Sequence, residues 1–249
     1  MFKIGGDKIL VSDFYHMYEY HPKTGLNKIN ELSQADVYRH ESVFIDSDGD
    51  IWNGRQRDGL FILDKETGQV THLNHESTPS LVYQDYIVDF LEDDEGDIWI
   101  ATEQGWTIYD KKNQTTQNYL SKDVSQDYAY DFRIINALAQ SQNGQVWLGT
   151  SSNGIFLWNK TTESIIKHIN LQNGLNSNGI HDIKVDNNQN LWIATEKGIS
   201  WVNTATWEVK NFGKELGISG ATYVIDITCL LYTSPSPRDR TRSRMPSSA

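Results

Sequence analysis

One short pattern recurs four times along this chain: a turn of acidic or amide residues is followed by an apolar strand with a central tryptophan. The copies read DSDGDIW, DDEGDIW, SQNGQVW and DNNQNLW, and their tryptophans are Trp52, Trp99, Trp147 and Trp192. These tryptophans are 47, 48 and 45 residues apart. A period of this size is typical of repeat proteins in which each unit is one small sheet.

The second copy shows most clearly how one unit is built. Residues 87–91 are apolar and β-prone, and the turn that follows ends on Gly96, which adopts positive φ at low cost. Residues 97–102 alternate as a half-buried strand does, and residues 106–110 and 116–120 give two more strands. Four antiparallel strands per unit predict an all-β fold, a β-propeller made of four-stranded blades.

The periodic aromatic residues have two interpretations. Trp52, Trp99, Trp147 and Trp192 lie mid-strand with apolar neighbours at alternate positions, so we expect them to pack between adjacent blades. Sugar stacking is the alternative, although a ligand rarely contacts the same position of every blade. We also expect the third-strand aromatics to be core residues: Phe61, Tyr109, Trp158 and Trp201.

The units resemble the two-component regulator propeller repeat, whose pattern is D-x-x-G-x-[IL]-W-[IL]-[GA]-T-x-x-G-[IL]-x-x-[WY]-[DN]. The stretches that carry the resemblance are DSDGDIWNGRQRDGLFILD, DDEGDIWIATEQGWTIYD, SQNGQVWLGTSSNGIFLWN and DNNQNLWIATEKGISWVN. The segment NGLNSNGI, residues 173–180, is similar to the lead-in to a blade in that family. Asn53, Arg55 and Gln189 depart from the pattern, where an apolar residue, Thr and Gly are expected.

The repeat divides the chain into four whole and two partial blades. The predicted units are a partial blade at 1–32, whole blades at 33–80, 81–128, 129–174 and 175–215, and the first strand of another blade at 216–228. The partial blade at 1–32 is expected to lack its first strand. The start at Met1 does not read as a secretory signal, because charged residues interrupt any apolar core.

Residues 229–249 share neither the strand period nor the turn chemistry of the repeats. The stretch from Cys229 to Asp239 resembles the conceptual translation of a sequencing adapter, so we interpret this tail as non-native. A disordered tail or a basic arm for nucleic acid is the alternative. Without the tail, residues 1–228 hold 18 basic and 32 acidic residues, a net charge of −14, which argues against nucleic acid as a partner.

The sequence carries no recognisable catalytic or metal-binding constellation. Cys229, in the tail, is the only cysteine, and the common hydrolase, metalloprotease and phosphate-loop motifs are not found. The turn at residues 46–50 starts like a calcium loop, but its Gly is misplaced and Arg57 stands where a bidentate Glu is needed. His72 and His75 point to opposite faces of a regular strand, which disfavours a zinc site. We therefore expect no metal and no cofactor.

The resemblance implies a sensor. It predicts the ligand-sensing propeller of a two-component signalling protein of the hybrid histidine kinase type. This propeller is expected to be extracytoplasmic, in the periplasm, and to detect oligosaccharides or other small molecules. The propeller itself is not expected to be an enzyme. The implied partners are the remaining blades, downstream signalling domains, a membrane reached only through other segments, and a second copy in a homodimer. The alternatives are a protein-interaction scaffold and, with less support, a propeller lyase or glycosidase.

Recognition is expected in the loops between blades, because strands are tied to the blade template. These loops carry tyrosines beside amides and an arginine, groups that can stack on a sugar and hydrogen-bond to it. The candidate ligand-binding residues are Tyr83, Tyr86, Tyr128, Tyr130 and Arg133. Packing of these side chains against their own blades is the alternative.

Overall fold

The computed structural model describes residues 2–3, 9–12, 16–29, 32, 40–77, 82, 84–120, 134–141 and 144–213. Within them the chain forms five antiparallel sheets of four strands each, and the order of the strands in every sheet follows the chain. The predicted all-β propeller architecture is confirmed. One turn of 3-10 helix, η2 (Leu171–Asn173), leads from the fourth sheet toward the fifth.

Each sheet is a meander of short strands. Sheet 1 holds β1 (Phe2–Lys3), β2 (Ile9–Ser12), β3 (Met17–His21) and β4 (Gly25–Lys28), and sheet 2 holds β5 (His40–Ile45), β6 (Ile51–Arg55), β7 (Gly59–Leu63) and β8 (Val70–Leu73). Sheet 3 holds β9 (Ile87–Glu92), β10 (Ile98–Thr102), β11 (Gly105–Asp110) and β12 (Thr115–Leu120). Sheet 4 holds β13 (Ile135–Gln140), β14 (Gln145–Thr150), β15 (Ile155–Asn159) and β16 (Ser164–Ile169), and sheet 5 holds β17 (Ile180–Val185), β18 (Leu191–Thr195), β19 (Gly198–Val202) and β20 (Val209–Phe212).

The N-terminal unit corrects one expectation. The sequence predicted that residues 1–32 lack a first strand, but β1 pairs with β2 through Phe2 opposite Leu10 and Lys3 opposite Ile9. This strand has only two residues, too few to show any alternation of apolar and polar positions, so the pattern did not reveal it. The division into units stays a prediction, because most of its boundaries, and all of residues 214–249, lie outside the described residues.

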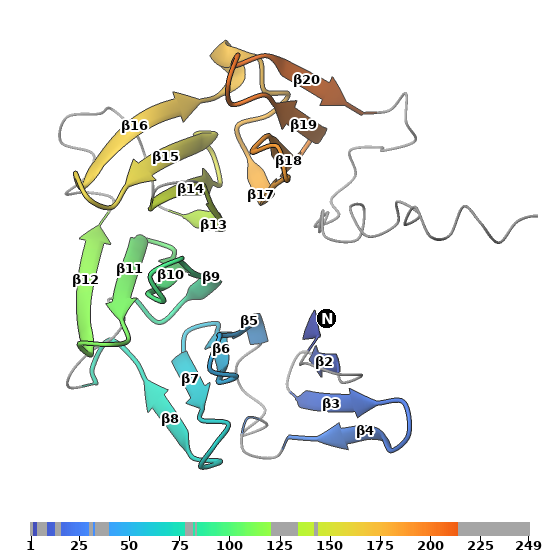
Figure 1. The fold of residues 1–249 in the computed structure, drawn as a ribbon, viewed down its shortest axis with the longest axis vertical. Helices are drawn as coiled ribbons and strands as arrows, with labels where there is room; N and C mark the ends of the chain where they lie inside the picture. Colours follow the sequence, from blue (N-terminus) through green and yellow to red (C-terminus); the bar gives the residue numbers. More distant parts are fainter. Residues whose placement is uncertain are drawn as a thin grey trace, which may run out of the picture.

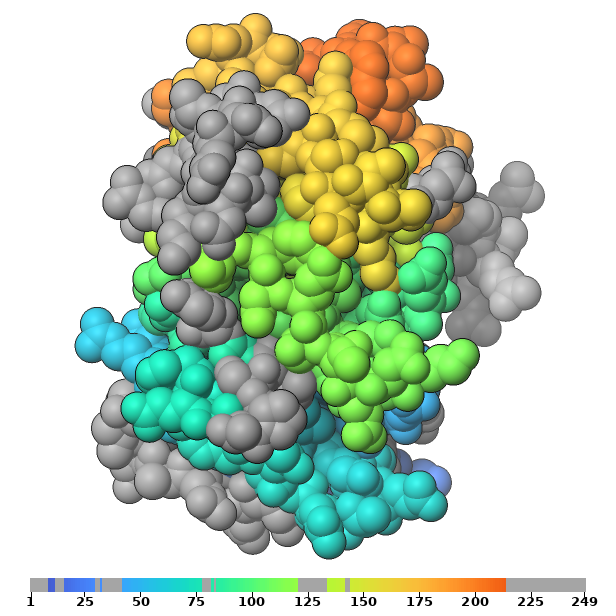
Figure 2. All heavy atoms as spheres, turned by 90° about the vertical axis from the view of Figure 1, so that its left-hand side faces the viewer, coloured from blue at the N-terminus to red at the C-terminus, as the bar shows by residue number. Residues whose placement is uncertain are grey.

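The sheets follow one another around an arc with their first strands on its inner side, where β5, β9, β13 and β17 are neighbours (Figure 1). The last strands lie on the outside, and Figure 2 shows the outer parts of sheets 2, 3 and 4 stacked in order. Small residues on the second strands allow the first strand of the next sheet to come close on this inner side. A Cβ at Gly149 would lie only 2.8 Å from the Cγ2 atom of Ile180 on the next sheet, so this position of sheet 4 favours glycine.

The hydrophobic core lies between sheets rather than within them. Trp52, Trp99 and Trp147 are at most 2% exposed, and each packs against residues of the following sheet. Trp52, for example, lies 5.9 Å from the ring of Tyr109 and 6.3 Å from that of Phe90. The prediction that these three tryptophans pack between blades is confirmed.

Trp192, Tyr109 and Trp201 differ from the expectation, because all three are half-buried. Trp192 and Trp201 lie opposite each other on the face of sheet 5 that points away from sheet 4, where no described sheet covers them. Trp192 stacks on Phe212 of its own sheet, 6.0 Å away. Phe61 and Trp158, in contrast, are buried as predicted.

Candidate functional site

The antiparallel meander gives the arc two different faces. The turns after the first and third strands of each sheet, such as residues 46–50 and 110–114, lie on one face, which we call the turn face. The loops after the second strands, such as residues 56–58, and the connections between sheets, such as residues 84–86, lie on the other, which we call the loop face. Tyr86, one of the predicted ligand-binding residues, belongs to the loop face.

Of the five predicted ligand-binding residues, the structure describes Tyr86. Tyr83, Tyr128, Tyr130 and Arg133 lie outside the described residues. Tyr86 is half-buried in the connection between sheets 2 and 3, and its hydroxyl accepts a hydrogen bond of 3.4 Å from Gln56 Nε2 in the loop after β6. Loops of neighbouring sheets therefore meet at this tyrosine.

The neighbouring backbone joins the same two loops. The amide of Gly59 donates to the carbonyl of Asp85 at 3.0 Å, and His75 contacts the Asp85 carboxylate through Nδ1 at 2.6 Å. An equivalent bond runs from Gly154 N to Asn178 O between sheets 4 and 5, at 2.8 Å. These bonds fix the loops relative to each other, so a side chain such as Tyr86 is held on a rigid support.

A buried arginine lies under the loop after β6, at a position where the repeat normally has Thr. Arg55 is 3% exposed; its Nη2 donates to Leu32 O at 2.7 Å and its Nη1 lies 3.4 Å from Asp58 Oδ2. Asn53, the other departure from the repeat, accepts from Arg55 Nε at 3.3 Å. Burial lowers the pKa of Arg55, and Asp58 partly offsets that effect. The two departures are one network, which sequence reasoning did not connect.

A stack of three side chains continues from this network. The Arg55 guanidinium lies 3.8 Å from the centre of the Phe61 ring. The His72 ring stacks on the same Phe61 ring, with 4.0 Å between the two ring centres. His72 Nε2 contacts the Asp58 carbonyl at 2.7 Å. In sheet 4 the same positions hold Phe156, His168 and Asn153, with a ring distance of 4.1 Å and a hydrogen bond of 2.7 Å. Burial lowers the pKa of His168, which favours its neutral form.

The turn face carries acidic turns with a repeated structure. In the turn after β9, Asp93 Oδ1 accepts the amides of Glu95 and Asp97 at 3.0 Å each, and its Oδ2 accepts the indole N–H of Trp99 at 2.8 Å. Asp46 holds Trp52 in the same way at 3.0 Å, and Asp186 holds Trp192 at 3.4 Å. The first Asp of the motif is thus the acceptor for the motif's own tryptophan.

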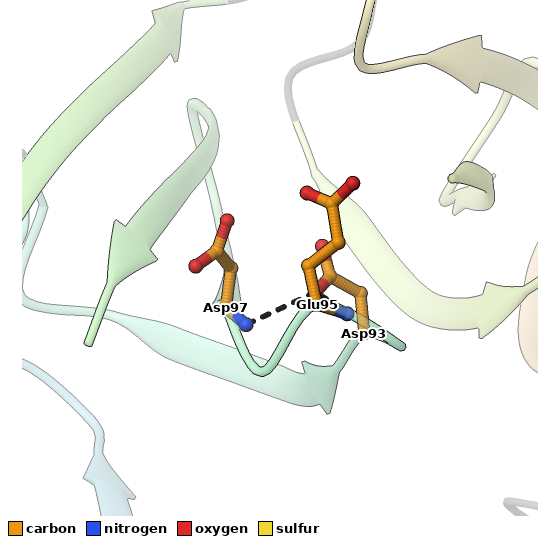
Figure 3. A group of neighbouring side chains, drawn as sticks. All are labelled: Asp93, Glu95 and Asp97. Atoms are coloured by element: carbon orange, nitrogen blue, oxygen red, sulfur yellow. Dashed lines mark hydrogen bonds between the residues drawn. The ribbon is translucent and has the colours of Figure 1, made fainter. Parts of the chain in front are cut away.

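Asp93, Glu95 and Asp97 point toward one another and offer a candidate cation site (Figure 3). A cation of the protein itself lies there. Lys160, which follows β15 of the next sheet, places Nζ 2.8 Å from Asp93 Oδ2, 2.8 Å from Glu95 Oε2 and 2.5 Å from Asp97 Oδ2. Burial alone would lower the pKa of Lys160, but the three carboxylates outweigh it and raise that pKa. The geometry is that of an ion-pair cluster between sheets, and we assign no metal to it.

The sequence carries a signal for this cluster that its repeat pattern did not reveal. The residue pairs at the ends of the third strands are Asp64-Lys65, Asp110-Lys111, Asn159-Lys160 and Asn203-Thr204. A lysine at the same point of three units indicates a repeated contact, as the tryptophans do. The acidic partners Asp46 of Lys111 and Asp93 of Lys160 lie more than 60 residues earlier in the chain.

The comparisons agree with this geometry. The model of the family described as "Two component regulator propeller" matches residues 81–104 and 174–197. Both segments are similar to the two-component regulator propeller repeat. The matched segments cover the same parts of sheets 3 and 5: the connection, the first strand, the acidic turn and the second strand. No curated protein matches the chain at a significant level.

Several solved structures share the propeller repeat fold. The extracellular domain of the hybrid two-component system BT4673 from B. thetaiotaomicron is 21% identical, with a TM-score of 0.63 over 83% of this chain and 30% of that one. The corresponding domain of BT3049 from B. thetaiotaomicron is 19% identical, with a TM-score of 0.62 over 81% and 29%. PorZ, a surface component of the type-IX secretion system of Porphyromonas gingivalis, is 18% identical, with a TM-score of 0.64 over 84% and 33%.

The propeller lyases have a similar fold as well. Virginiamycin B lyase from Staphylococcus aureus is 14% identical, with a TM-score of 0.62 over 86% of this chain and 72% of the enzyme. The chain spans about a third or less of the length of the two-component and secretion proteins that it matches. At these identities the likeness concerns the fold. The described residues include no helix that is both long and apolar enough to cross a membrane.

Proposed function

We propose that this chain is part of the ligand-sensing propeller of a hybrid two-component signalling protein and that this propeller lies outside the cytoplasm. The observation that supports this most directly is the pair of family matches, which fall on the same structural element of sheets 3 and 5. The similar extracellular domains of two-component systems support the same assignment. In this proposal the propeller binds and does not catalyse, and signalling is left to other domains of the protein.

The ligand in this proposal is an oligosaccharide or another small polar molecule bound on the loop face. Tyr86 supports this choice, because its ring and hydroxyl belong to a loop that is held by Gln56 and by the Gly59–Asp85 bond. Tyr83, Tyr128, Tyr130 and Arg133 complete the proposed surface. A tyrosine on a rigid loop supplies both a stacking ring and a hydrogen-bonding group at little entropic cost.

A propeller lyase is the second candidate, since virginiamycin B lyase shares the fold over most of this chain. Two histidines of the loop face, His72 and His168, argue against it. The rings of His72 and His168 each stack on a phenylalanine and each contact a main-chain carbonyl, an arrangement that positions a loop. A general base instead needs its ring nitrogen directed at a substrate.

Two experiments test the sensor proposal. Sequencing the encoding gene on both sides of the region for residues 1–228 should find a membrane-spanning segment followed by a kinase core. A stop codon directly after the propeller would contradict the signalling role and favour the scaffold.

The binding role is tested on the whole sensor region by calorimetric titration with a panel of oligosaccharides. Tyr86→Ala and the double variant Tyr128→Ala/Tyr130→Ala should each weaken binding at least about tenfold, the range for removal of a contact worth about 1.4 kcal/mol. Tyr20→Ala is the matched control, because Tyr20 is an exposed tyrosine on β3, away from these loops. Equal affinity in the parent and both variants would remove these residues from the site.

A further inference from the structure

A lysine clamp joins sheets 2 and 3 on the turn face. Lys111, which follows β11, places Nζ 2.9 Å from Asp46 Oδ2 and 2.5 Å from Asp48 Oδ2 on sheet 2, and 3.4 Å from Glu92 Oε1 on its own sheet. Glu92 also accepts two hydrogen bonds of 2.7 Å from Ser47, through the amide and the hydroxyl. The clamp ties the tryptophan-binding Asp of one sheet to the next sheet.

Sheets 3 and 4 are joined in the same way. Lys160 binds Asp93, Glu95 and Asp97 of the preceding sheet, and Gln117 donates to Glu163 across the same junction at 2.7 Å. Both clamps therefore repeat one design: an acidic turn on one sheet and a lysine that follows the third strand of the next.

The junction between sheets 4 and 5 lacks both halves of this clamp. Ser141 stands where the other turns have Asp, and Thr204 stands where the other sheets have Lys. Thr204 Oγ1 donates to the Gln189 carbonyl of its own sheet at 2.8 Å. The indole N–H of Trp147, whose equivalents bind Asp46, Asp93 and Asp186, is buried and has no hydrogen-bond partner among the described residues.

An aromatic residue occupies this part of the junction instead. Trp207, in the turn between β19 and β20, reaches back to Trp147 with its ring centre 6.4 Å away, and Lys167 Nζ lies 4.1 Å from the centre of the Trp207 ring. Trp207 has φ +62 and is 40% exposed. The left-handed region is unfavourable for a bulky residue, and sheet 2 has Gly68 at the corresponding position. Gln114 and Glu163, at the corresponding positions of sheets 3 and 4, also have positive φ, so this conformation is a property of the turn.

Hydrogen bonds join sheets 4 and 5 at two other places: on the loop face, and on the inner side of the arc, which we call the inner rim. Gly154 N donates to Asn178 O at 2.8 Å, and Asn136 Nδ2 donates to Ile180 O at 2.8 Å. We propose that the junction between sheets 4 and 5 is a hinge of the arc. It is fixed along the loop face and the inner rim and opens on the turn face by release of Trp207 from Trp147.

The test compares hydrogen exchange at the indole N–H groups of the full 249-residue chain by nuclear magnetic resonance. The Trp147 indole should exchange at least about tenfold faster than the Trp99 indole, which is protected by Asp93 and by the clamp. The double variant Ser141→Asp/Thr204→Lys rebuilds the clamp and should slow the Trp147 indole about tenfold. Ser141→Asn/Thr204→Gln is the matched control: it adds similar bulk without the ion pair and should slow exchange far less.

Trp207→Ala gives a second test that does not depend on the double variant folding. It should speed exchange at Trp147 while exchange at Trp99 stays as in the parent, since only the junction between sheets 4 and 5 is opened. Equal rates at Trp147 and Trp99 in the parent would overturn the hinge, and so would a Trp207→Ala variant in which both indoles accelerate equally. Both results would mean that the arc opens only by global unfolding.

Discussion

Replacement of Asp93 by Ser offers a direct test of how the acidic turns stabilise the propeller, because the chain already contains this replacement at Ser141. The Asp93 carboxylate accepts two amides, the Trp99 indole and Lys160. Serine can accept one amide bond but cannot reach the indole. We expect Asp93→Ser to lower the free energy of unfolding by about 3 kcal/mol.

The magnitude follows from what remains unpaired. Lys160 keeps Glu95 and Asp97, so its charge stays compensated. The indole N–H of Trp99, which is 0% exposed, loses its acceptor, the Asp93 carboxylate, and stays buried. A buried donor left without a partner costs about 1–3 kcal/mol, and a hydrogen bond to a charged group contributes about 1.5–3 kcal/mol. The cost of the unpaired indole and the loss of its hydrogen bond to a charged group describe partly the same effect, so they are not added. We therefore expect a total near the upper end of either range, about 3 kcal/mol.

Urea unfolding of the parent, Asp93→Ser and Ser141→Ala measures this, with tryptophan fluorescence as the signal. Ser141→Ala is the matched control, because the Trp147 indole has no hydrogen-bond partner among the residues that the structure describes, and we expect its effect to stay below about 1 kcal/mol. The reasoning is refuted if Asp93→Ser and Ser141→Ala shift the midpoint by the same amount.

The pH dependence gives an independent check. Burial alone would raise the pKa of Asp93, but the bonds from Lys160, Trp99 and the Asp97 amide outweigh it and lower that pKa below 3.8. A carboxyl group with a lowered folded-state pKa contributes stability that is fully present above its unfolded-state pKa and is lost as the pH falls through the folded-state value. The stability difference between the parent and Asp93→Ser should therefore be constant above about pH 5 and shrink below pH 4. A constant difference down to pH 2 would exclude this role for the carboxylate.

Three further predictions concern single positions. Trp99→Ala should lower the free energy of unfolding by about 3–5 kcal/mol and half-buried Trp192→Ala by clearly less, as measured by urea unfolding; equal effects would contradict the packing between sheets. Gln189→Gly should raise the free energy of unfolding by about 1 kcal/mol in the same assay, because Gln189 has φ +63 where the other turns have Gly49, Gly96 and Gly144. Burial raises the pKa of Asp89 to about 6, so its ionisation should destabilise the fold between about pH 4 and 6; Asp89→Asn should flatten that part of a stability–pH profile, and an unchanged profile would refute the assignment.

The fold could be predicted from the sequence because its strongest signals are local. In sheets 2 and 3 the first hairpin is specified by neighbouring residues: the turn glycine, the alternating strand and the tryptophan six residues after the Asp. The two-residue strand β1 was missed because it is too short for a pattern. Trp201 was assigned to the core because its own strand looks like the others, whereas its exposure depends on which sheet covers it.

The candidate ligand site was less predictable for the same reason. Loops carry no repeated pattern, so Tyr86 could be proposed only from its residue type, and its contact with Gln56 joins positions 30 residues apart. The Arg55–Asn53 network was visible in the sequence only as two departures from the repeat. Each departure looked like a local fault, and only the structure shows that one residue accepts a hydrogen bond from the other.

The sheet junctions show what a repeat sequence encodes beyond its own unit. Asp46 and Asp93 act within one hairpin, where they bind a tryptophan six residues away, and across a junction, where they bind a lysine more than 60 residues away. Because one carboxylate serves both contacts, loss of the Asp at Ser141 removes the reason to keep a lysine at Thr204. Replacement of the Asp by Ser141 and of the Lys by Thr204 is therefore expected to occur together. Its structural consequence is that the Trp147 indole N–H is buried with no hydrogen-bond partner among the described residues.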